Sequence, residues 1–140
     1  LLFILFRPDY SAMTPASLLL ALAACMVSFF INFLLGAIVS CVAFWTTRVY
    51  ALSEFLYGFF MLLGGTFVPL ELLPPLAQRI AQVLPFQLFI YFPIQLALGR
   101  LDQAQILLNF GLQAFWLVVF WLGFRWVWRE GVKKFSAVGA

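Results

Sequence analysis

The sequence predicts an all-α fold, a polytopic bundle of membrane helices with a re-entrant or interfacial helical pair on its outer face. Hydrophobic residues make up 66% of the 140 residues and charged residues 9%, with a mean hydropathy of +1.09. Soluble domains average about 45–50% apolar and 25% charged residues, so lipid is the expected solvent. Three apolar runs of helix length and one proline-broken apolar stretch fill residues 1–140, which we assign to a single transmembrane domain. There is no room for a soluble catalytic domain, and we expect no enzyme activity from this chain.

The first span is predicted at about 15–45. Thr14 is a suitable N-cap and Pro15 a suitable first-turn residue. Its 31 residues extend ~46 Å, more than the ~30 Å of a hydrocarbon core, so the helix must tilt or project. Small and weakly polar residues recur on one side at three- or four-residue spacing, which is typical of a helix-packing face: Ser17, Ala21, Cys25, Ser28, Asn32, Gly36 and Ser40. Leu22, Met26, Phe29 and Phe33 cover the other side. Asn32 either contacts a transported substrate or, as we favour, hydrogen-bonds another helix.

The second span is predicted at about 51–67 and contains the acidic residue Glu54. Glu54 shares a helix face with Gly58, Met61 and Gly65, where the glycines allow a neighbouring backbone to approach. One interpretation makes Glu54 an ion-pair or proton-coupling site inside the bundle. The other, which we favour, is a carboxylate near the start of the helix that reaches interfacial water and complements the helix dipole.

The stretch 68–100 is too apolar for an ordinary loop and too broken for a spanning helix. Five of the seven prolines of the chain lie in it: Pro69, Pro74, Pro75, Pro85 and Pro93. Pro75 is expected to begin a short amphipathic helix along the membrane surface. Residues 86–98 are apolar but fall short of the ~20 needed to cross, which predicts a re-entrant or interfacial piece. We interpret the five prolines, together with Gly64 and Gly65 at the end of the second span, as a candidate gate.

The last span is predicted at about 104–124. Gln105, Asn109 and Gln113 form a polar stripe at four-residue spacing. Such a stripe faces protein or water, so it either lines a path for a polar or amphiphilic substrate or makes inter-helix hydrogen bonds. With Asn32, these three residues are the substrate-path candidates.

The cationic residues divide unequally between the two sides of the predicted bundle. Five are assigned to one side, Arg48, Arg125, Arg129, Lys133 and Lys134, and three to the other, Arg7, Arg79 and Arg100. The positive-inside rule therefore predicts a cytoplasmic C-terminus and an outer position for 68–100. The basic tail is interpreted as an inner-leaflet anchor, and no nucleic-acid partner is expected. With no histidine and only two separated cysteines, the sequence predicts no metal and no cofactor.

The chain begins with the apolar run LLFILF and has no initiator methionine. We interpret it as the C-terminal part of a longer protein whose preceding span ends near Phe6.

Three segments carry a resemblance to a known family: GGTFVPLELLPPLAQRIAQVLPF, FPIQLALGR and GVKKFSAVGA. They resemble the C-terminal half of ABC-2 type exporter permeases, in particular the ABC-2 family transporter protein that partners a daunorubicin-type ATPase. The resemblance implies six spans per full subunit, a multi-pass protein of the bacterial inner membrane, a second permease subunit (identical or different) and a separate cytoplasmic ABC ATPase that powers export.

The chain has no GxxxxGK[ST] phosphate loop, so it cannot bind and hydrolyse ATP by that means. The alternative hypothesis is a membrane scaffold or assembly subunit that transports nothing, in which the polar stripes only hold helices together.

Overall fold

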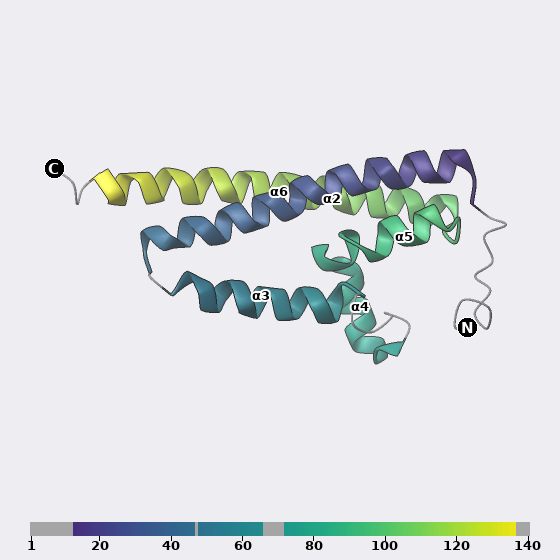
Figure 1. The fold of residues 1–140 in the computed structure, drawn as a ribbon, viewed down its shortest axis with the longest axis horizontal. Helices are drawn as coiled ribbons and strands as arrows, with labels where there is room; N and C mark the ends of the chain where they lie inside the picture. The colour runs from purple at the N-terminus through teal and green to yellow at the C-terminus, as the bar shows by residue number, and fades with distance from the viewer. Residues whose placement is uncertain (1–12, 47, 66–71, 137–140) are drawn as a thin grey trace, which may run out of the picture.

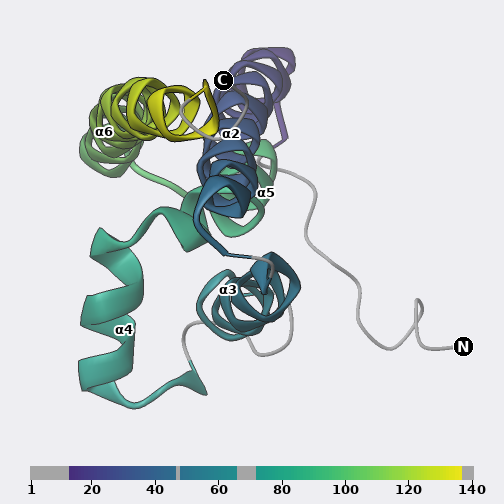
Figure 2. The same ribbon diagram turned by 90° about the vertical axis from the view of Figure 1, so that its left-hand side faces the viewer.

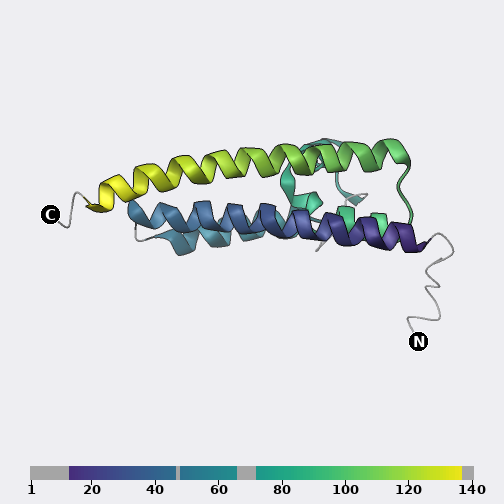
Figure 3. The ribbon, with the colours of Figure 1, turned by 90° about the horizontal axis from the view of Figure 1, so that it is seen from above.

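Two long helices lie side by side and run in the same direction, and the shorter helices pack along them (Figures 1 and 3). The computed structural model describes residues 13–46, 48–65 and 72–136, with the backbone alone for 135 and 136. In chain order the elements are α2 (Pro15–Cys41), the 3₁₀ turn η1 (Val42–Phe44), α3 (Val49–Leu63), α4 (Pro75–Val83), the 3₁₀ turn η3 (Pro85–Leu88), α5 (Tyr91–Ala97) and α6 (Gln103–Ser136). Helices α2 and α6 are the parallel pair.

Two of these helices are long and apolar enough to cross a membrane. They are Pro15–Phe44, with a mean hydropathy of 2.5, and Gln103–Lys134, with a mean hydropathy of 1.8. The bent pair Pro75–Val83 and Pro85–Ala97 gives a third candidate if it is counted as one span. The predicted all-α membrane helix bundle is confirmed.

The start of α2 follows its local sequence. The Thr14 hydroxyl oxygen accepts a hydrogen bond from the Ser17 backbone N–H at 3.1 Å, and the Ser17 hydroxyl oxygen accepts one from the Thr14 N–H at 3.0 Å. This reciprocal pair is a capping box, and Pro15 occupies the first turn as predicted.

The predicted packing face of α2 is only partly correct. Ala21 and Ser28 are buried, but Cys25, Asn32, Gly36 and Ser40 are exposed. Each four-residue step advances about 40° beyond a full turn, because the helix has about 3.6 residues per turn. The stripe therefore rotates away from α6 after Ser28. Its last members turn toward α3 instead.

Helix α3 is shorter than the predicted span of 51–67. It has 15 residues, about 22 Å long at ~1.5 Å each, and ends at Leu63 with Gly64 as its C-cap. Gly65 has a φ of 73°, a left-handed conformation that suits glycine and ends a helix. Helix α3 runs back alongside the C-terminal half of α2 and does not reach the N-terminal end (Figure 1).

The broken stretch begins as predicted, with Pro75 as the first residue of α4. The predicted single piece 86–98 is wrong, because η3 and α5 divide it. The chain bends by 68° between α4 and the segment Pro85–Ala97. Pro93 lies in the first turn of α5, where its missing N–H has no intrahelical partner to lose, so the helix starts at Tyr91. Pro69 lies outside the described residues.

Of the apolar face predicted for α4, only Leu84 at its end packs on the core. Leu76, Ile80 and Val83 are exposed, whereas Ala81 is buried. Figure 2 shows α4 standing to one side of the bundle. Its position along a membrane surface stays a prediction.

Helix α6 extends well beyond the predicted 104–124. It has 34 residues, about 51 Å at ~1.5 Å each, and it continues through Trp126 and Trp128. The tryptophans and arginines end the hydrophobic run, but no proline interrupts the backbone, so the helix continues. Its far end projects past α2 (Figure 3).

Gly64→Ala should destabilise the fold by about 1–3 kcal/mol, as overpacking does. A Cβ there would overlap the carbonyl oxygen of Phe60 and lie 3.3 Å from that of Phe86. The matched control is Gly58→Ala in the interior of α3, where a Cβ meets nothing within 4 Å. That change should be neutral or stabilising by about 0.5–1 kcal/mol. Thermal unfolding in detergent measures both, and equal effects would contradict the close packing of Gly64.

Candidate functional site

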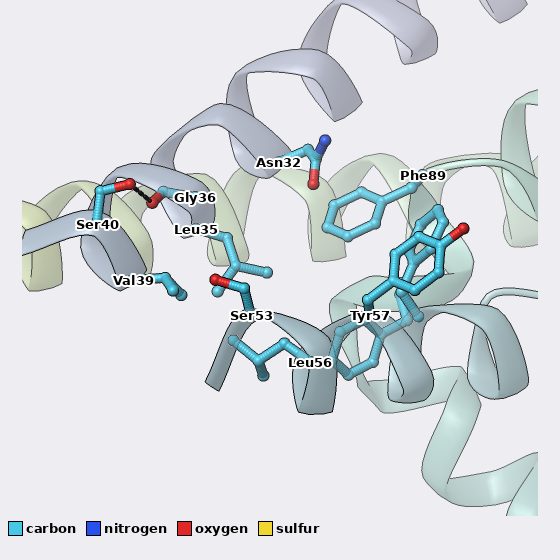
Figure 4. Close-up of a pocket in the computed structure, with 11 residues that line it drawn as sticks. Asn32, Leu35, Gly36, Val39, Ser40, Ser53, Leu56, Tyr57 and Phe89 are labelled. Atoms are coloured by element: carbon cyan, nitrogen blue, oxygen red, sulfur yellow. Dashed lines mark hydrogen bonds between the residues drawn. The ribbon is translucent and has the colours of Figure 1, made fainter. Parts of the chain in front are cut away.

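A cleft of about 380 Å³ lies between α2 and α3 (Figure 4). Its wall combines apolar side chains with a few uncharged polar ones: Asn32, Leu35, Gly36, Val39, Ser40, Ser53, Leu56, Tyr57, Phe60, Phe86 and Phe89. The rotation of the small-residue stripe explains why α2 contributes Asn32, Gly36 and Ser40 here. Ligand pockets of proteins share this composition and usually measure about 300–1,000 Å³.

Two polar groups of the cleft are available to a ligand. The hydroxyls of Ser40 and Ser53 donate to carbonyl oxygens of their own helices, those of Gly36 at 2.9 Å and Val49 at 3.1 Å. In contrast, the Asn32 carboxamide and the Tyr57 hydroxyl have no hydrogen-bond partner among the described residues. Asn32 extends from α2 toward the ring of Phe89 (Figure 4).

One end of the cleft is closed by the 3₁₀ turn η3 and the residue that follows it. The ring of Phe86 lies 6.4 Å from that of Phe59, and the ring of Phe89 lies 5.7 Å from that of Phe60. Gly64 is buried against the same turn. The break thus puts aromatic side chains across the end of the α2–α3 cleft.

The gate candidates are only partly brought together. Pro85 is buried in η3, close to Gly64, and Pro93 is buried in α5. Pro74 and Pro75 lie at the exposed start of α4.

A buried hydrogen-bond node, formed by Ser28, Leu88 and Gln113, joins three elements. The Ser28 hydroxyl donates to the Leu88 carbonyl oxygen at 2.6 Å. The Gln113 side-chain amide donates to the Ser28 hydroxyl oxygen at 2.9 Å and to the Ala24 carbonyl oxygen at 3.0 Å. Gln113 is 0% exposed, and its Oε1 has no partner among the described residues. Gln113 therefore fixes α6 to α2 and, through Ser28, to η3.

A second cavity, of about 270 Å³, lies on the other side of η3, beside the start of α6. It is lined by Gln82, Gln87, Tyr91, Phe92, Gln95, Leu101, Gln105, Leu108, Asn109 and Leu112. Gln105 also caps α6: its Oε1 accepts from the Asp102 N–H at 3.1 Å, and its N–H donates to Asp102 Oδ1 at 2.7 Å. The cavity is called the amide cavity below.

The four substrate-path candidates occupy three different places. Asn32 lines the α2–α3 cleft, Gln105 and Asn109 line the amide cavity, and Gln113 is in the node. The sequence reasoning missed several lining residues: Ser53, Tyr57, Gln82, Gln87 and Gln95. Gln82, Gln87 and Gln95 lie inside an apolar, proline-broken stretch, and their presence there was a signal in the sequence for the amide cavity. No comparable signal marked Ser53 or Tyr57.

Glu54 is exposed on α3, and no ion pair reaches it within the described part of the chain. An ion pair on that part joins the exposed side chains of Lys133 and Glu130 at 2.7 Å. The role of Glu54 stays a prediction. No group of three or more acidic or cysteine side chains able to hold a metal occurs in the described ranges.

Long apolar helices with a broken helix pair between them define an α-helical integral membrane protein. Residues 10–139 match the family model described as ABC-2 family transporter protein, and the chain belongs to this family. The resemblance to the ABC-2 transporter family inferred from sequence is confirmed. Family members are membrane transport components that work with an ATPase partner. Comparisons with curated proteins and with solved structures give no significant match.

Ser28→Ala should cost about 1–3 kcal/mol of stability, because it leaves the Leu88 carbonyl oxygen and the Gln113 amide short of partners in a buried site. Gln113→Leu should cost less, on the order of 0.6 kcal/mol, since it also removes the unpaired Oε1. The control is Ser40→Ala on the same helix, which loses only a bond to its own turn and should change little. Denaturation of the purified protein ranks the three, and a Ser28→Ala variant as stable as Ser40→Ala would refute the structural role of the node.

Proposed function

We propose that this chain is the permease subunit of an ATP-driven ABC exporter, with energy supplied by a separate cytoplasmic ATPase. The family match carries the proposal, and the α2–α3 cleft that ends at a broken helix supports it. The complete transporter contains a second permease subunit, identical or different, in the bacterial inner membrane.

The basic end of α6 sets the proposed orientation. Arg125, Arg129, Lys133 and Lys134 follow the apolar part of this helix, which is the pattern of a cytoplasmic end. Because α2 runs parallel to α6, the first turns of both helices and α5 then lie toward the outside (Figure 1). The amide cavity, which α5 and the start of α6 line, lies on the same side.

The α2–α3 cleft is proposed as part of the substrate path. Its aromatic and aliphatic wall suits an apolar body, and Asn32 with the Tyr57 hydroxyl offers uncharged hydrogen bonds. Among the described residues, no ionised side chain lines the cleft. The arrangement favours an amphiphilic substrate without a strong charge at this position.

The 3₁₀ turn η3 is the proposed gate element. It closes one end of the cleft with Phe86, and it lies between two cavities that its displacement would connect. Pro85 begins this turn, and the adjacent Gly64 lets it pack closely on α3. Of the glycines and prolines named as gate candidates from the sequence, Pro85 and Gly64 with their neighbours form the proposed gate.

The full-length protein purified alone should show no ATPase activity, and co-expression with its ATPase should yield a complex with two copies of each subunit. Its thermal stability should rise in the complex, because a partner that binds only the folded state stabilises it by mass action. Mass measurement in mild detergent and thermal unfolding check the two statements.

A thiol reagent that cannot cross membranes should label Lys134→Cys only after the cells are opened, and Arg79→Cys from outside.

These results separate the exporter from the scaffold. A full-length protein that is stable alone and recovers no ATPase under mild solubilisation would favour the scaffold. Labelling of both cysteines from outside intact cells would overturn the orientation.

Tethering η3 to α3 should block transport while leaving ATP binding by the partner intact. Cysteines in place of Phe60 and Phe89, in a background lacking Cys25 and Cys41, can be joined with a short bifunctional thiol reagent, since the native rings are 5.7 Å apart. Export by reconstituted vesicles, measured before and after tethering, gives the result.

The control pair replaces Phe29 and Phe33, whose rings lie 6.4 Å apart on α2 itself and do not line the cleft. This tether should not alter export. If the Phe60–Phe89 tether also leaves export at the normal rate, η3 is a static plug.

A further inference from the structure

The amide cavity collects carboxamide side chains from four separate elements. Gln82 comes from α4, Gln87 from η3, Gln95 from α5, and Gln105 and Asn109 from α6. Neither the family match nor the proposed gate requires this concentration. A cavity in which four consecutive elements of the chain each contribute the same chemical type of side chain points to a ligand of matching chemistry.

Several of these amides have hydrogen-bonding atoms to spare. Gln82 and Gln95 make no side-chain hydrogen bond within the described part of the chain. Asn109 uses its amide nitrogen on the Gln105 carbonyl oxygen at 2.8 Å and leaves its oxygen open. The buried Gln87 uses its amide nitrogen on the Gln82 carbonyl oxygen at 2.8 Å and likewise leaves its oxygen open. The cavity therefore presents open donors and acceptors together.

None of the described residues that line the cavity is ionised, so these residues offer nothing to neutralise a buried charge. An ion entering it would lose hydration without compensation. A hydroxyl group, in contrast, both donates and accepts, and a carboxamide supplies both complements. The ring of Phe92 and the leucines Leu101, Leu108 and Leu112 provide apolar wall for the carbon face of such a ligand.

We propose that the amide cavity binds an uncharged, hydroxyl-rich group, of the size of one sugar ring. Its volume of about 270 Å³ is just below the usual range of ~300–1,000 Å³ for ligand pockets, which limits the occupant to one ring-sized group. The group is carried either by a glycolipid headgroup or by a free glycoside. This site is separate from the α2–α3 cleft. Binding of the sugar group to it does not require that the protein be an exporter.

The test uses the full-length protein in phosphatidylcholine nanodiscs, without the ATPase. Monoglucosyl diacylglycerol and phosphatidylglycerol are titrated separately at equal mole fractions, and bound lipid is counted by native mass spectrometry. The sugar lipid should bind in preference to both phosphatidylcholine and phosphatidylglycerol. Gln95→Leu and Asn109→Leu should each weaken it about fivefold, the effect of one lost neutral hydrogen bond.

Gln103→Leu is the matched control, because Gln103 is exposed on the same helix and does not line the cavity. It should bind the sugar lipid like the wild type. Gln95→Leu removes no internal hydrogen bond, so it keeps the test valid even if Asn109→Leu fails to fold.

Free methyl glucoside added to the loaded nanodiscs distinguishes the two sources. Displacement of the lipid shows that a free glycoside suffices, and its absence shows that the acyl chains are needed; both retain the sugar chemistry. The proposal is overturned if the sugar lipid binds no better than phosphatidylcholine, if phosphatidylglycerol binds better, or if Gln95→Leu binds like the wild type. Since no ATPase is present, failure here leaves the exporter proposal standing.

Discussion

The hydrogen bond from the Ser28 hydroxyl to the Leu88 carbonyl oxygen holds the broken stretch against the long helices. A 3₁₀ turn inside an apolar bundle leaves backbone carbonyls without the partners that an α-helix would supply, and buried carbonyls need replacements. Ser28 provides one at 2.6 Å, and Gln113 supports Ser28 from the opposite helix. The positions of η3, of the two cavities and of α5 all depend on this contact, because η3 is where the chain turns between them.

The 3₁₀ turn η3 distributes its four residues to different neighbours. Phe86 lines the α2–α3 cleft and Gln87 the amide cavity, while the Leu88 side chain is buried in the core that includes Ala21 and Ala24. Successive residues of a 3₁₀ helix point about a third of a turn apart, so one turn serves three surfaces. The break is thus what separates an aromatic compartment from an amide-lined one.

Local chemistry made the helix starts predictable. Thr14 with Ser17, and Pro75 at the head of α4, carry their signals within one turn of chain. The helix ends were less accessible, since α6 continues beyond its apolar run and Gly65 stops α3 earlier than hydropathy indicates. The destinations of the polar side chains could not be predicted at all from spacing. Gln105, Asn109 and Gln113 share one helix face, yet the first two border a cavity and the third is buried against α2, because the neighbours of α6 change along its length. Only the tertiary arrangement decides which helix each residue meets.

The unbroken length of α6 gives the bundle a mechanical property. This helix connects the basic segment around Lys133 to the cap at Asp102 without a proline, so bending stiffness is maintained from end to end. A rotation or shift applied to the projecting end is therefore transmitted as a rigid-body movement to Gln113 and on to the amide cavity. By contrast, α2 ends in the 3₁₀ turn η1, and α3 begins as a new helix at Val49. The helical backbone is therefore interrupted between α2 and α3. Helix α6 is thus one continuous helix, whereas α2 and α3 are separate helices joined by a short connection.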